Sequence, residues 1–185
     1  MQRLLPLALV LAVALLVVGC GSKKPETTAE WANGVCTAVS TWATSMTSSV
    51  SSVTAGSVSK DSIQSAGDDM KSATDTLRSD LKDLGKPNTQ AGEQAKTSID
   101  QLSSELSTSA DAIKSAVDSA SDVSSAVAAA ATVSTTLKTM KNQVTSTYTS
   151  LKQLDNGELQ TAFKQSSACT QLTKQLSSLS TQVSG

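Results

Sequence analysis

Apolar side chains recur at intervals of three and four residues through most of this chain, and this spacing most limits how it can fold. The first stripe takes steps of 4, 4, 3, 4, 4 and 3 through Trp31, Val35, Val39, Trp42, Met46, Val50 and Val53. Four further stripes run through 63–84, 95–117, 127–154 and 159–183. Residues three and four apart lie on one face of an α-helix, so each stripe predicts an amphipathic helix. No segment shows a sustained period of two, and the chain is therefore predicted to be all-α.

Residues at the ends of the stripes predict where the helices begin and end. Thr27 lies three residues before Glu30, the capping-box spacing that would begin the first helix. Gly-Lys-Pro at 85–87 predicts the end of the second helix, and Asp-Asn-Gly at 155–157 predicts the turn before the fifth. Only a weak break near 119–124 separates the third and fourth helices, so one longer helix is the alternative there. The middle of the fifth stripe is less regular, with one step of six residues.

These helices predict an elongated bundle. A helix of 25 residues is about 37 Å long at ~1.5 Å per residue. Short connections between long helices favour antiparallel neighbours. We therefore expect one domain over 27–185, an up-down antiparallel bundle of about four to five helices.

The first twenty residues read as an export signal. Residues 1–3 are Met-Gln-Arg, and an unbroken apolar run follows from Leu4 to Val18, which is typical of a secretory signal peptide. At fifteen residues, the run is shorter than the ~20 residues that cross a hydrocarbon core, which argues against an uncleaved membrane helix. The sequence Val17-Val18-Gly19-Cys20 resembles the lipobox of bacterial lipoproteins. The resemblance implies that 1–19 is removed, that Cys20 is acylated, and that 20–26 tethers the domain to the outer face of the cell membrane.

The cysteines predict a covalent link inside the bundle. With Cys20 acylated, Cys36 and Cys169 remain as an even pair in an oxidising compartment, and we predict a disulfide between them. In an up-down bundle the first and fifth helices run parallel, and the two sulfur atoms would lie about 14 and 18 Å from the same end. A redox-active pair is the alternative. Such pairs usually have Cys-x-x-Cys spacing, which this chain lacks.

Two other groups of side chains have both a structural and a functional interpretation. Trp31 and Trp42 are eleven residues apart and share a helix face, so we expect them in the core; a ligand pocket or a bilayer contact is the alternative. Carboxylates line one side of the second helix at Asp68, Asp69, Asp75, Asp80 and Asp83. A catalytic carboxylate pair is conceivable there. Basic residues interleave with them at helical spacing, however, which is typical of a solvated, ion-paired face.

Composition excludes several classes of function. The chain has 15 Lys and Arg and 16 Asp and Glu, and loss of Arg3 with the signal leaves a net charge of −2. Without a strongly basic surface, nucleic acid is not an expected partner. The chain has no histidine, which is the commonest general acid–base and transition-metal ligand. We therefore expect no catalytic residues, no metal and no cofactor, and do not expect an enzyme.

Three segments resemble a known group of proteins. They are Trp31-Ala32-Asn33-Gly34-Val35-Cys36-Thr37-Ala38-Val39-Ser40-Thr41-Trp42, Leu81-Lys82-Asp83-Leu84-Gly85-Lys86-Pro87 with Thr89-Gln90-Ala91-Gly92, and Phe163-Lys164-Gln165-Ser166-Ser167-Ala168-Cys169. Together they are similar to uncharacterised secreted and lipid-anchored helical proteins of actinobacteria. The resemblance covers most of the chain after the signal and implies no catalytic or binding residues.

The sequence thus predicts a lipid-anchored envelope protein without enzymatic activity. It would bind the membrane through Cys20 and act as an interaction or structural module, with an envelope protein as its possible partner and an oligomeric state that the sequence leaves open. The alternative is a lipoprotein that holds a small molecule or lipid between its helices. In that case Trp31 and Trp42 are the candidates for the pocket.

Overall fold

The computed structural model describes residues 27–54, 59–154 and 157–183, without the side chains of 53, 54 and 178–183. This part of the chain forms helices and no strands. The helices are α1 Thr28–Thr54, α2 Lys60–Leu84, α3 Gly92–Asp118, α4 Val123–Leu151, α5 Glu158–Gln165 and α6 Ser167–Val183. The predicted signal peptide, Cys20, the tether and the first two residues of the Asp-Asn-Gly turn lie outside the described residues.

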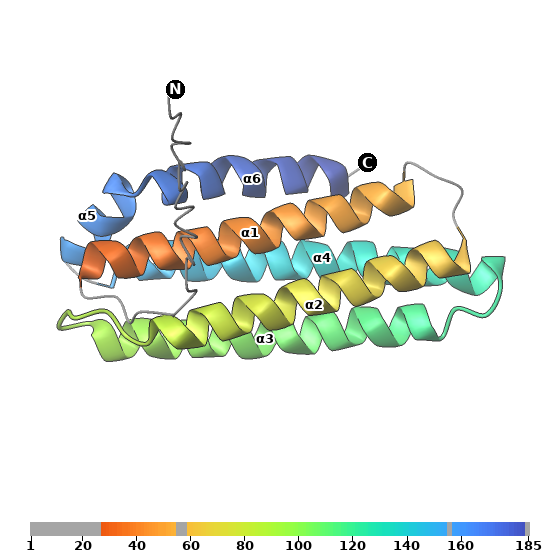
Figure 1. Ribbon diagram of the computed structural model, residues 1–185, viewed down its shortest axis with the longest axis horizontal. Coiled ribbons are helices and arrows are strands. Elements are labelled where there is room, and N and C mark those ends of the chain that lie inside the picture. The colour runs from red at the N-terminus through yellow and green to blue at the C-terminus, as the bar shows by residue number, and fades with distance from the viewer. Residues whose placement is uncertain (1–26, 55–58, 155–156, 184–185) are drawn as a thin grey trace, which may run out of the picture.

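The long helices lie side by side and alternate in direction, which confirms the predicted up-down bundle (Figure 1). α1 packs against α2, α5 and α6, while α3 packs between α2 and α4, and α4 also contacts α6. We call the end that holds the start of α1, the 85–91 connection and α5 the α5 end. The opposite end, called the far end, holds the 119–122 connection and the start of α4 (Figure 1).

Local capping chemistry explains the helix boundaries. The Glu30 backbone N–H donates to Thr27 Oγ1 over 3.2 Å, and the Thr27 N–H donates to the Glu30 carboxylate over 3.0 Å, so the predicted capping box is confirmed. α2 ends at Leu84, one residue before Gly85, whose φ of 64° favours glycine. α3 and α4 are separate helices, because Asp122 caps α4 in a second such box.

The fifth stripe forms two helices rather than the single expected one. Ser166 has an extended backbone between α5 and α6, and its Oγ accepts a hydrogen bond from the Cys169 N–H over 3.3 Å. The same hydroxyl donates to Asn33 Oδ1 on α1 over 3.0 Å. This break accounts for the step of six residues from Phe163 to Cys169, because the stripe restarts in a new helix.

Where side chains are described, most residues of the apolar stripes form one continuous core, and α4 holds an exposed exception. The sequence assigns Val127 to the buried stripe, but its side chain is 62% exposed. The buried face at the start of α4 instead uses Ala126 and Ala129. In the run of small residues from 126 to 131 several faces are apolar, so the pattern does not distinguish the one that the neighbouring helices cover.

Candidate functional site

The disulfide connects the first and last helices of the bundle. Cys36 of α1 and Cys169 of α6 form it with a Cα–Cα distance of 4.9 Å, as the sequence predicts. Both residues are buried, and Ser166 links the same two helices through Asn33 one turn away. α1 and α6 are therefore fixed to each other near the α5 end by a covalent bond and a hydrogen bond.

Three of the four aromatic side chains form a cluster at the α5 end. Trp31 meets Phe163 edge to face at a centroid distance of 6.1 Å, and Tyr148 meets the same ring at 5.5 Å. The Trp31 Nε1–H donates to the Gly85 carbonyl over 3.2 Å. Partial burial raises the pKa of Tyr148, and Lys152 lies over its ring. Edge-to-face contacts of this kind fix the packing of α1, α4 and α5.

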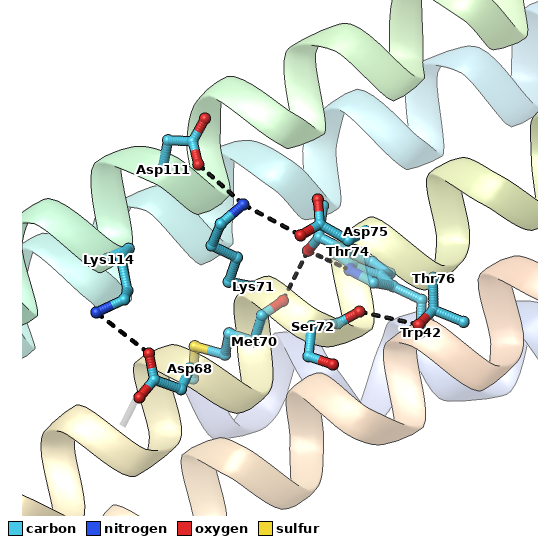
Figure 2. A network of polar contacts seen from close by, with 10 residues as sticks. All are labelled: Trp42, Asp68, Met70, Lys71, Ser72, Thr74, Asp75, Thr76, Asp111 and Lys114. Carbon is cyan, nitrogen blue, oxygen red and sulfur yellow. Dashed lines mark hydrogen bonds and ion pairs between the residues drawn. The ribbon is translucent and has the colours of Figure 1, made fainter.

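Trp42 is held in the core by a threonine of the neighbouring helix. Its Nε1–H donates to Thr74 Oγ1 over 3.2 Å, and the Thr74 hydroxyl donates in turn to the Met70 carbonyl over 2.9 Å (Figure 2). Trp42 and Thr74 are each 1% exposed. A buried indole N–H needs an acceptor, and Thr74 supplies it without an additional buried charge. The sequence places Trp42 on the core stripe but does not reveal this partner.

A surface groove of about 420 Å³ runs between α1 and α2. Most of its lining is hydroxyl-bearing, namely Thr41, Thr44, Ser45, Ser48, Ser49, Ser72 and Thr76. Trp42 and Leu77 lie beneath these side chains, and Asp69 and Asp80 stand on the α2 side. Trp42 lines this groove and Trp31 does not.

Two similar grooves follow the other antiparallel pairs. One of about 430 Å³ lies between α3 and α4, where Gln101, Glu105 and Gln143 are among its lining residues. The other, of about 360 Å³, lies between α2 and α3 beside Arg78 and Asp100. All three grooves are shallow. The exposed lining is more apolar than polar in the α1–α2 groove, about evenly divided in the α3–α4 groove, and more polar than apolar in the α2–α3 groove.

Two ion pairs join α2 to α3, and each of the two lysines that form them has a further pair within its own helix. Lys71 of α2 lies 3.1 Å from Asp75 and 3.2 Å from Asp111 of α3, while Lys114 of α3 lies 3.2 Å from Asp68 of α2 (Figure 2). Lys114 also pairs with Asp118. The hydrogen bonds that Lys71 donates, first to Asp75 and second to Asp111, raise the pKa of Lys71. Asp68 and Asp75 on the acidic side of the second helix are therefore exposed and ion-paired, as the charge spacing indicates.

Charge is distributed unevenly around the bundle. α2 and α3 together carry eleven acidic and six basic side chains. α4 and α6 carry three lysines and no acidic residue, and these lysines are Lys138, Lys141 and Lys174. The small net charge of the chain therefore hides one acidic and one basic side, which an overall charge count does not reveal.

The described residues contain no cluster of three or more His, Cys, Asp or Glu side chains that is suited to a metal ion. None of the helices in the described ranges is long and apolar enough to cross a membrane.

The fold and the covalent link together define a disulfide-linked, all-α up-down bundle. In comparisons with family models, with curated proteins and with solved structures, the chain matches none of them.

Proposed function

We propose that this chain is a lipid-anchored protein of the bacterial envelope and acts there as a non-enzymatic interaction or structural module. The observation that carries the proposal is the N-terminal sequence, in which an apolar run from Leu4 to Val18 is followed by Gly19 and Cys20. The Cys36–Cys169 disulfide supports it, because such bonds persist mainly in oxidising compartments outside the cytosol.

The position of the first helix supports a bundle held close to the membrane. α1 begins at Thr28, eight residues after Cys20, and the seven residues 20–26 span at most about 25 Å. The anchor would therefore hold the α5 end near the lipid surface. The Ser- and Thr-rich grooves between the helices then offer polar surfaces to other envelope components.

Intact mass spectrometry of the chain isolated from bacterial membranes tests the anchor. We expect a chain that begins at Cys20 and carries acyl groups, with the two-hydrogen mass deficit of one disulfide. In the matched variant Cys20→Ser the acyl mass should be absent and the protein should leave the membrane fraction. A wild-type chain that begins at another residue, or that carries no acyl group, would contradict the proposal.

The α1–α2 groove favours a second candidate, a lipoprotein that binds a small molecule. Its lining combines hydroxyls and the carboxylates of Asp69 and Asp80 with the apolar side chains of Trp42 and Leu77, which suits a ligand with both polar and apolar parts. Native mass spectrometry of the gently released protein tests this candidate. A monomer with a defined additional mass that is lost in Ser45→Leu would support ligand binding. A bare monomer, or a complex with another chain, would favour the interaction module.

A further inference from the structure

One flank of α4 is exposed although it carries large apolar side chains. Val123 is 80% exposed and Val127 62%. Lys138 and Lys141 follow on the same flank, because steps of 4, 11 and 3 residues each approximate whole helical turns. We call these four side chains, together with Lys174 of α6, the α4–α6 flank.

The flank is exposed because α6 is shorter than α4. At ~1.5 Å per residue, the 17 residues of α6 extend about 25 Å and the 29 residues of α4 about 43 Å. Tyr148 of α4 lies beside Thr173 of α6, and the two helices run in opposite directions. Ten residues beyond Thr173, the end of α6 therefore lies opposite Lys138. Val123 and Val127 lie beyond that point, at the far end of the bundle.

The charges of the flank have one sign. Lys138, Lys141 and Lys174 take part in none of the ion pairs among the described residues, whereas Lys71 and Lys114 on α2 and α3 each have two acidic partners. Asp122, the nearest acidic residue before Val123, accepts a hydrogen bond from the Ser125 N–H over 2.8 Å in the cap of α4. Three lysines without acidic partners beside two exposed valines match an anionic lipid surface, where cations meet headgroups and apolar side chains enter the interface.

We propose that the α4–α6 flank docks the bundle lengthwise on an anionic lipid bilayer. This inference builds on the proposed anchor, which would supply a bilayer within reach of the bundle. Without the flank, a single short tether would leave the bundle free to stand upright on its α5 end. With it, the acidic α2–α3 side faces away from the membrane and is presented to soluble partners.

Energy transfer from a dye on the protein to an acceptor lipid distinguishes the two orientations. One dye is placed at Ala131→Cys, on exposed α4 near the far end, and the other at Ser79→Cys, on exposed α2 near the α5 end. An upright bundle brings position 79 closer to the lipid, and a docked bundle brings position 131 closer. The acylated full chain is reconstituted in phosphatidylcholine vesicles with or without about 30% phosphatidylglycerol, an anionic lipid.

We expect transfer from position 131 to exceed that from position 79 only in the anionic vesicles. The variant Lys138→Glu/Lys141→Glu/Lys174→Glu should reverse this order, because each lysine shifts such an equilibrium roughly fivefold. The matched control Lys60→Glu/Arg78→Glu/Lys82→Glu on α2 makes the same change in net charge and should leave the order unchanged. Salt at about 0.5 M should act like the α4–α6 variant, since it screens exposed charges.

Three results would overturn the proposal. The first is greater transfer from position 79 in both kinds of vesicle. The second is an equal effect of the two triple variants. The third is self-quenching of the dye at position 131 in uncharged vesicles, if the variant Val127→Ser abolishes it. Such quenching would mean that a second copy of the chain, and not lipid, covers the flank. An intact mass recorded on the same sample shows whether the chain is acylated, and so separates failure of the anchor from failure of docking. If the chain is not acylated, co-sedimentation of the unacylated chain with the same vesicles still tests whether the flank binds lipid.

Discussion

At the scale of single residues, Thr74 shows how a polar side chain serves an otherwise apolar core. Its hydroxyl accepts from Trp42 and donates to Met70, so both groups are satisfied away from water. The neighbouring Thr76 donates to the Ser72 carbonyl in the same way but is exposed (Figure 2). Both threonines thus donate the same kind of hydrogen bond to their own helix. Only Thr74 is buried and also accepts a hydrogen bond from the Trp42 indole.

We predict that Thr74→Val destabilises the protein by about 1–3 kcal/mol, because it leaves the buried Trp42 N–H without an acceptor. Thr76→Val is the matched control and should change the free energy of unfolding by less than about 0.5 kcal/mol. Urea unfolding followed by circular dichroism measures both. Equal changes in the free energy of unfolding for the two variants would mean that the hydrogen bond from Trp42 to Thr74 does not contribute to stability.

At the scale of helices, the apolar stripes predicted structure that residue propensity does not favour. Ser and Thr propagate helix poorly, and the chain has 32 and 23 of them. In the structure many of their hydroxyls donate to the carbonyl four residues earlier, as Thr97 and Ser103 do. Such bonds leave the helix ladder in place and satisfy the hydroxyl locally. The stripes located the helices because burial of one face outweighs these propensities.

The connection between α2 and α3 depends on a close backbone approach at Gly92. A Cβ atom built there would lie 2.3 Å from the Pro87 carbonyl oxygen, which belongs to the backbone and cannot rotate away. We predict that Gly92→Ala destabilises the protein by about 1–3 kcal/mol. Gly157 has no heavy atom within 4 Å of the same position, and Gly157→Ala should be close to neutral. Thermal unfolding compares them, and a neutral Gly92→Ala would show that the connection adjusts freely.

The cap of α4 makes part of the stability dependent on pH. Hydrogen bonds from Ser125, first from its backbone N–H, lower the pKa of Asp122. A carboxylate whose pKa is lower in the folded state stabilises the fold above its unfolded pKa, and this contribution is lost as the pH falls through the folded pKa. Asp122→Asn keeps an acceptor that does not titrate. The wild type should therefore be more stable than the variant at neutral pH, and the difference should shrink below about pH 4. A difference that is constant between pH 7 and pH 2, as followed by urea unfolding, would contradict this.

At the scale of the whole molecule, the sequence predicted the fold better than the surface. The all-α class, the up-down order and the Cys36–Cys169 bond follow from periodicity and cysteine number, and the structure confirms them. The break at Ser166 appeared only as one irregular step, because a single residue ends one helix and caps the next. The exposure of Val127 depends on how far α6 reaches along α4. Periodicity within one helix carries no information on the length of its neighbours.

The disulfide should stabilise the whole bundle. It closes a segment of 133 residues, for which the chain-entropy relation gives about 5 kcal/mol. We predict that reduction lowers the free energy of unfolding by up to that amount. In Cys36→Ser/Cys169→Ser, reductant should have no effect, which separates the bond from other consequences of reducing conditions. Urea unfolding with and without reductant measures this, and equal stability of the oxidised and reduced wild type would contradict it.

The same bond determines how the protein responds to a pulling force. A load applied between the two ends of the chain passes from α1 to α6 through the sulfur atoms and bypasses the 133-residue segment between them. At ~3.5 Å per extended residue, roughly 450 Å of polypeptide is thereby withheld from stretching. An anchored protein of this design would lengthen only by unravelling the short segments outside the bridge. The greater part of α1 through α5 would then stay folded under tension.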